Sequence, residues 1–269
     1  MADQGGLRRV ALITQAGAMA GPKLAEILAR AGHDLVVEGA RPEQVERLSA
    51  LGADVLALND PACAAPGVGP GADPAACERL VAQALERFGR IDAAALSPRS
   101  GGAGFVRGPF LEASVEDLRG MLGYFDTTFL WLRALIPPMR RQGGGQIVVF
   151  TSAAGKRPEA NWSLYGAVRA GQSFLVQAVA LEHAKDGICI NALGSKNVVA
   201  PDFPLAPAGA ITDDHIERGA WSAPLEAETP LGRLGRIEEL AAFAAVLLDG
   251  RSQFQTGQFF AYSGGWDVD

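Results

Sequence analysis

Three polar side chains in the middle of the chain, Ser152, Tyr165 and Arg169, have the types and spacing of an acid–base site. Tyr165 and Arg169 are four positions apart, so they lie on one face of a helix. A neighbouring guanidinium favours the phenolate form of a tyrosine, and a phenolate can accept a proton. Ser152 follows an apolar run and can hold a substrate oxygen by a hydrogen bond. The trio therefore predicts proton transfer at an oxygen atom of a small substrate.

The elements that must position these residues follow an alternating pattern. Short apolar runs alternate with segments of helical period, which is typical of βαβ units on a parallel sheet. The runs predict strands at 10–14, 34–38, 54–58, 91–96, 146–151, 188–192 and 258–262. The segments between them predict helices at 22–31, 42–51, 75–88, 114–139, 161–186 and 237–248. We therefore expect one α/β domain over residues 1–269, a Rossmann-like doubly wound parallel seven-stranded sheet in a three-layer α/β/α sandwich.

Two segments rich in proline interrupt this pattern. Residues 61–74 predict an external connection without a catalytic role. Residues 197–230 follow the sixth predicted strand, beside the carboxyl-end crevice where open α/β sheets bind ligands. We expect this second segment to be a lid over the substrate. The alternative is a surface insertion without a role in function.

Composition limits the classes of partner. A net charge of −6 argues against a nucleic-acid partner, and no Lys/Arg-rich run opposes that conclusion. The first nine residues are too short and polar for a signal peptide, and no apolar stretch is long enough to cross a membrane. The three cysteines and three histidines lack the spacing of metal ligands. These features predict a cytoplasmic protein without a metal.

The trio belongs to a wider resemblance. Serine, a tyrosine thirteen positions later and a basic residue four further on form the active-site pattern of the short-chain dehydrogenases/reductases, which the chain resembles over nearly its whole length. Asp60 after the third predicted strand supports the resemblance, as do Thr256-Gly257-Gln258 and Ser263-Gly264-Gly265 near the end. In that superfamily the residue matching Asp60 contacts the adenine of a nicotinamide cofactor.

The chain departs from the superfamily pattern where that cofactor binds. Gln15 and Met19 stand at two positions of the glycine-rich loop that are normally glycine. Arg169 replaces the usual lysine, Tyr124 replaces a structural asparagine, and Leu96-Ser-Pro-Arg99 replaces Asn-Asn-Ala-Gly. A side chain at the second glycine position projects toward the pyrophosphate, which normally approaches bare backbone. We therefore expect no nucleotide cofactor.

These departures resemble one branch of the superfamily, the halohydrin dehalogenases, whose Ser-Tyr-Arg triad has the same spacing. The resemblance implies a lyase that converts vicinal halohydrins reversibly to epoxides and opens epoxides with halide, azide, cyanide or nitrite. Other motifs are similar to the members that accept bulky cyclic epoxides. In this mechanism Tyr165 takes the hydroxyl proton, Arg169 stabilises the phenolate and Ser152 binds the same oxygen. The alkoxide then displaces the halide.

The leaving halide needs a pocket of its own. We expect it near Met19 and near Gly194, Ser195 and Lys196, where amide groups and side chains would stabilise the charge. Met19 replaces the aromatic residue of the dehalogenase loop, and Lys196-Asn197 replaces its Asn-Tyr. The halide affinity should therefore differ from that of the branch.

Two alternatives remain open. One is an NAD(P)-dependent short-chain dehydrogenase/reductase with a divergent cofactor loop, in which Arg41 could bind a 2′-phosphate. The other is a non-catalytic member of the fold. In the superfamily the helices matching 114–139 and 161–186 pair subunits, so we expect a homotetramer and place Trp162 in a subunit interface.

Overall fold

The computed structural model describes residues 8–58, 73–99, 107–201, 203, 206–212 and 215–268. Asp60 and most of the predicted connection at 61–74 lie outside the described residues.

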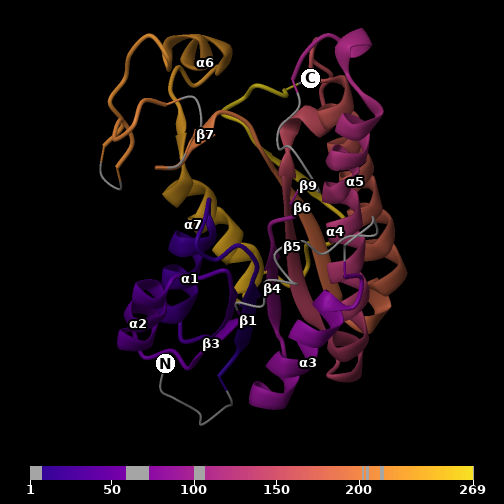
Figure 1. Ribbon diagram of the computed structural model, residues 1–269. Coiled ribbons are helices and arrows are strands. Elements are labelled where there is room, and N and C mark those ends of the chain that lie inside the picture. Colours follow the sequence, from indigo (N-terminus) through magenta and orange to yellow (C-terminus); the bar gives the residue numbers. More distant parts are fainter. Residues whose placement is uncertain are drawn as a thin grey trace.

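The central sheet has seven parallel strands in the order β3-β2-β1-β4-β5-β6-β9 (Figure 1). The strands are β1 Val10–Ile13, β2 Asp34–Glu38, β3 Val55–Leu58, β4 Ala93–Leu96, β5 Gly145–Ser152, β6 Ile188–Ser195 and β9 Phe259–Tyr262. The order reverses between β1 and β4, and ligands of such sheets bind at the carboxyl ends of the strands beside this reversal. The predicted fold class is confirmed.

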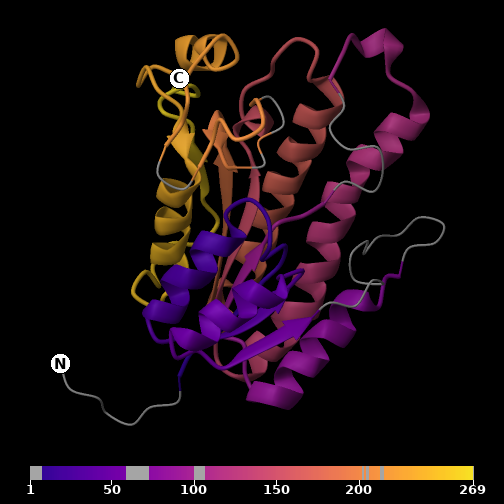
Figure 2. The same ribbon diagram turned by 60° about the vertical axis from the view of Figure 1, so that its left-hand side comes forward.

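Helices cover both faces of the sheet, as Figures 1 and 2 show. One face carries α1 Gly21–Arg30, α2 Pro42–Ala50 and α7 Ile237–Leu248, and the other carries α3 Ala76–Phe88, α4 Val115–Arg141 and α5 Ser163–His183. Each layer buries its own apolar core against the sheet. Both faces are covered, so the strands are apolar on both sides, and this explains their continuous apolar runs in the sequence.

Helix α4 begins with a capping box. The side chain of Ser114 accepts a hydrogen bond from the Asp117 amide at 3.0 Å, and the Asp117 carboxylate accepts one from the Ser114 amide at 2.9 Å. The helix continues to Arg141 in spite of Pro137 and Pro138. Leu135 and Met139, on the buried side of the helix, pack in the core. This packing stabilises the last turns of the helix, which therefore tolerate two prolines.

The predicted lid at 197–230 contains short regular elements. Strand β7 Val198–Val199 pairs with β8 Gly235–Arg236, and α6 Ala223–Glu228 follows later in the segment. Figure 1 shows α6 and β7 at the same end of the molecule as the C-terminus. Elements of two and six residues contain too few positions to show a period, which is why the sequence predicts only a loop here.

No helix in the described part of the chain is both long and apolar enough to span a membrane.

Candidate functional site

Ser152 is the last residue of β5, at the carboxyl end of the sheet. It pairs with Ser195 of β6, and its hydroxyl lies 3.5 Å from the Ser195 carbonyl oxygen. The same hydroxyl accepts a hydrogen bond from the Ala154 amide at 3.2 Å, which starts the short 3-10 turn Ala153–Gly155. The oxygen of Ser152 is therefore fixed at the point where ligands of this fold class bind.

Gly155 brings this turn against α5. A Cβ on Gly155 would lie 2.7 Å from the Arg169 carbonyl carbon and 2.8 Å from the Ala170 nitrogen, so only glycine allows this approach. Tyr165 is in the first turn of α5 and Arg169 is one turn further on. The structure thus brings the Ser152 turn against the helix that carries Tyr165 and Arg169. The sequence analysis did not identify Gly155, although a glycine shortly after a strand signals close backbone approach.

Aromatic rings surround Tyr165, which is 8% exposed. The Trp162 ring lies 5.5 Å from the Tyr165 ring, and the Tyr124 ring meets it edge-on at 6.0 Å. Met121 and Val168 complete this apolar cluster. Trp162, which we placed in a subunit interface, therefore packs on the candidate proton-transfer residue of its own chain.

Arg169 is also 8% exposed, and its guanidinium lies near two aromatic rings and a buried side-chain amide. The guanidinium carbon is 3.6 Å from the centre of the Tyr124 ring and 5.1 Å from the centre of the Tyr165 ring. Its Nη1 donates to Gln172 Oε1 at 2.9 Å, whereas its buried Nε has no hydrogen-bond partner among the described residues. This arrangement places a positive charge beside the Tyr165 ring in a part of the site that is largely closed to water.

Gln172 is a site residue that the sequence analysis missed. It is fully buried, and its Oε1 also accepts from Thr151 at 2.9 Å, while its Nε2 donates to Thr128 at 2.9 Å. These bonds fix the oxygen that holds Arg169. Its position could have indicated this role, because a polar residue three positions after Arg169 lies on the same side of the helix.

The residues predicted to form a halide pocket lie in two places. Gly194, Ser195 and Lys196 are beside Ser152, because β6 is the neighbour of β5. Met19 follows β1, which two strands separate from β6, or about 14 Å between strand axes. A Cβ on Gly194 would lie 2.5 Å from the Phe259 ring, so this part of β6 is closely packed.

Lys196 already has strong partners. Its ammonium group donates to both carboxylate oxygens of Glu159, at 2.9 and 2.7 Å, and lies 3.9 Å from Glu228 of α6. It also lies 4.5 Å from the centre of the Trp266 ring and 5.6 Å from that of Trp162. Lys196 therefore joins the lid segment, the loop before α5 and the C-terminal segment.

The loop between β1 and α1 keeps the backbone path of a glycine-rich loop. Gln15 and Met19 have positive φ angles of 49° and 50°, in the left-handed region that favours glycine. The first turn of α1 has few amide donors left for a phosphate, because the Gly21 amide donates to Ala18 and Pro22 has no amide hydrogen. The backbone shape of this loop therefore suits a dinucleotide, but few amide groups at the start of α1 are left to bind its phosphates.

Side chains occupy the neighbouring end of the crevice. Glu38 ends β2, where dinucleotide-binding folds carry an acidic residue for the adenosine ribose. Its buried carboxylate instead accepts hydrogen bonds from Arg99 Nη2 at 3.1 Å and from the Gln15 amide at 2.7 Å. The Gln15 side chain donates to the Ser97 carbonyl at 2.5 Å. As these residues stand, they do not fit a dinucleotide bound across the whole crevice.

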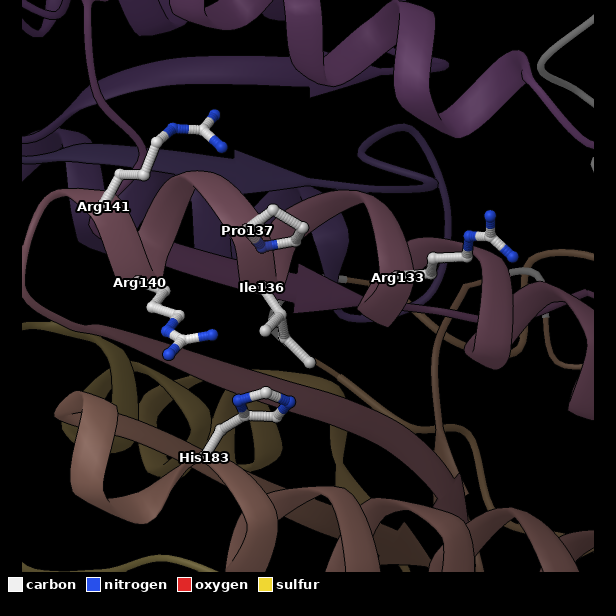
Figure 3. Close-up of a pocket in the computed structure, with 6 residues that line it drawn as sticks. All are labelled: Arg133, Ile136, Pro137, Arg140, Arg141 and His183. Carbon is white, nitrogen blue, oxygen red and sulfur yellow. The ribbon is translucent and has the colours of Figure 1, made fainter.

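A separate hollow of about 680 Å³ lies between the carboxyl-terminal parts of α4 and α5. Figure 3 shows Arg140 and Ile136 extending toward His183, while Arg141 extends to the other side of α4. His183 is eighteen residues after Tyr165, or about 27 Å along the helix. This hollow is therefore not part of the site around Tyr165. Metal-ligand clusters of three or more His, Cys, Asp or Glu residues are absent from the described ranges.

The sheet order and the Ser152–Tyr165 site together define a short-chain dehydrogenase/reductase. A family model described as Enoyl-(Acyl carrier protein) reductase matches residues 18–267, and the chain belongs to this family.

The chain is 30% identical to the cyclohexanol dehydrogenase of Acinetobacter sp. (strain SE19), over 96% of this chain and 94% of the relative. The structure of acetoin dehydrogenase from Enterobacter cloacae matches with a TM-score of 0.79 and 26% identity, covering 97% and 96% of the two chains. A structure titled "Dehalogenation enzyme" matches with a TM-score of 0.77 and 29% identity, covering 96% and 98%.

The prediction of a halohydrin dehalogenase, and hence of a lyase, is wrong. The family model describes a reductase, and named relatives such as the cyclohexanol dehydrogenase are oxidoreductases. The alternative that we left open, a dehydrogenase/reductase with a divergent loop, is better supported. The error lay in the weight given to the departures from the superfamily pattern, among them Gln15, Met19 and Arg169.

Proposed function

We propose that this protein is an oxidoreductase that interconverts a secondary alcohol and the corresponding ketone. The proposal rests on one observation above all: Ser152 and Tyr165 lie on adjoining elements at the carboxyl end of the sheet, in a chain that belongs to a reductase family.

The chain's own residues handle the substrate oxygen and its proton. The Ser152 hydroxyl accepts from the Ala154 amide and makes only a long contact of 3.5 Å with the Ser195 carbonyl oxygen, so its hydrogen can rotate toward the substrate oxygen. Tyr165 exchanges a proton with the same oxygen: its phenolate takes the alcohol proton during oxidation, and its phenol returns the proton to the ketone oxygen during reduction. The Arg169 charge beside the Tyr165 ring stabilises the phenolate that oxidation uses and reduction forms. The rings of Trp162 and Tyr124 keep water from the phenol. A nicotinamide dinucleotide is the hydride carrier of the superfamily.

The substrate class follows from the walls of the site. Trp162 and Trp266 both lie near the Lys196–Glu159 pair beside Ser152, and Trp266 is buried at 6% exposure, so Trp162 is the aromatic surface beside a neutralised charge. A flat aromatic wall suits an aliphatic ring better than a charged chain. A cyclic secondary alcohol is therefore the substrate class we propose, in keeping with the name of the cyclohexanol dehydrogenase relative.

A direct assay tests this function. The purified protein is incubated with NAD⁺ or NADP⁺ and a panel of cyclic and linear secondary alcohols, and the reduced dinucleotide is followed by its absorbance. Tyr165→Phe is the control, because it keeps the ring and removes only the hydroxyl. We expect cyclic alcohols to be oxidised by the wild type and not by the control. Turnover no greater than that of Tyr165→Phe with every alcohol would contradict the proposal.

We also propose that copies of the chain associate through α4 and α5 into a homotetramer. Both helices carry large apolar side chains on their outer surfaces, among them Phe129 at 43%, Phe174 at 73% and Leu181 at 75% exposure. Apolar surface of this kind is typical of protein interfaces.

A further inference from the structure

We infer that the Arg99–Glu38 ion pair closes the adenosine end of the crevice, so that an adenine dinucleotide binds only after Arg99 moves away. Glu38 ends β2 and Arg99 follows β4 by three positions, so the pair reaches across the carboxyl end of β1, which lies between these two strands. The Arg99 Nη2 atom lies 3.1 and 3.4 Å from the two carboxylate oxygens of Glu38.

The position of the guanidinium carries the inference. A Cβ built on Gly39 would have Arg99 Nη2 as its nearest neighbour, at 3.5 Å. Arg99 therefore lies across the backbone directly after β2. In dinucleotide-binding folds the adenosine ribose occupies this place and is bound by the acidic residue of the strand.

Glu38 is held in place on its other side as well. Its carboxylate accepts the Gln15 amide at 2.7 Å, and its backbone carbonyl accepts the Ala16 amide at 2.8 Å. Its side chain is 7% exposed, so its oxygens are turned inward and cannot reach ribose hydroxyls while Arg99 holds them. The acidic residue that could serve a nucleotide thus binds the chain's own arginine.

The closure is reversible because its mobile part is a long side chain. The side chain of Arg99 is 33% exposed, and a partly solvated ion pair is weak compared with a buried one. Backbone rearrangement is not needed, since the loop after β1 already has its left-handed residues at Gln15 and Met19. A dinucleotide must compete with Arg99 for this space, so its apparent affinity is reduced in proportion to the fraction of molecules that are open.

This inference rests on the proposed function only for the identity of the ligand. The test measures binding, not turnover, in isothermal titration calorimetry, with ADP-ribose and NADH as probes because neither carries the 2′-phosphate that Arg41 could bind. Arg99→Gly removes the guanidinium. Arg99→Ala also removes the guanidinium, without the added backbone freedom of glycine, and it leaves Glu38 in place for a ribose. Arg41→Ala is the matched control, because it removes the same charge at the start of α2, next to the same strand end.

We expect Arg99→Gly and Arg99→Ala each to raise the affinity for ADP-ribose and NADH by about tenfold or more, with Arg41→Ala close to wild type. Circular dichroism verifies that each variant is folded, and Arg99→Ala provides the test if Arg99→Gly is not. Unchanged affinity in the folded variants would overturn the inference. Weaker binding in Arg99→Gly would also overturn it, since Arg99 would then be a ligand of the phosphates.

The outcomes separate this inference from the proposed function. If Arg99→Gly binds NADH more tightly but no variant oxidises an alcohol, the closure stands and the function fails. If the wild type oxidises cyclic alcohols and Arg99→Gly binds dinucleotides no better, the function stands and the closure fails.

Discussion

Replacing Gln172 with leucine should weaken the fold and the site together. The side chain of Gln172 is fully buried and joins four partners: Arg169, Thr151, Thr128 and the Phe150 carbonyl. Leucine has a similar volume, so the change removes hydrogen bonds with little effect on packing. It leaves a buried guanidinium whose Nε already has no partner among the described residues.

The size of the effect follows from these contacts. A hydrogen bond to a charged group contributes about 1.5–3 kcal/mol, and a neutral one about 1 kcal/mol. Losing the bond to Arg169 and the two to threonine hydroxyls should lower the free energy of unfolding by about 3–5 kcal/mol. For a chain of this size that corresponds to a fall in Tm on the order of 10 °C.

Differential scanning calorimetry and urea denaturation measure this change. Gln177→Leu is the control, because it removes a glutamine from the same helix that makes one longer bond, 3.3 Å, to the Gly257 carbonyl. We expect the control to lose about 1 kcal/mol or less. A Gln172→Leu protein that matches Gln177→Leu in stability would show that the buried network contributes little, and the account of how Arg169 is held would have to be abandoned.

Four further outcomes are expected. Tyr165→Phe should lower alcohol oxidation by ~10²–10⁴-fold while the far-UV spectrum stays that of the wild type. Burial lowers the pKa of His33, so the unfolded chain binds the proton more readily than the folded chain. The free energy of unfolding should therefore fall as the pH is lowered from about 7 to 5, and His33→Gln should remove this dependence. Gly17→Ala should cost ~1–3 kcal/mol in chemical denaturation, because the new methyl group would lie 2.5 Å from the Gly39 carbonyl oxygen. Phe174→Lys should shift the homotetramer toward smaller species in light scattering, whereas a wild-type monomer at micromolar concentration would refute the association through α4 and α5.

Much of the fold could be predicted from the sequence because both helical layers bury the sheet. Strand β2 and helix α7 begin and end at the predicted residues, since their apolar runs are continuous and their ends have clear signals. Strand β6 extends three residues beyond its predicted end, through Leu193-Gly194-Ser195. Glycine and serine there favoured a loop, but pairing with β5 and β9 keeps them extended.

The candidate site was less predictable. The spacing of Ser152, Tyr165 and Arg169 was visible because strand and helix periods fix it. The ion pairs near these residues were not visible, because Lys196 and Glu159 are 37 positions apart in the sequence and Arg99 and Glu38 are 61 apart. Such pairs depend on which strand ends adjoin and on the rotamers of long side chains, and a single sequence records neither.

The left-handed backbone at Gln15 and Met19 bears on how this crevice could be altered by mutation. A side chain in that region costs about 1 kcal/mol relative to glycine, and both residues adopt it. Gln15→Gly and Met19→Gly therefore need no new backbone path and relieve strain. Either substitution removes a side chain while the loop keeps its present shape, so the lining of the crevice can change without a change of fold.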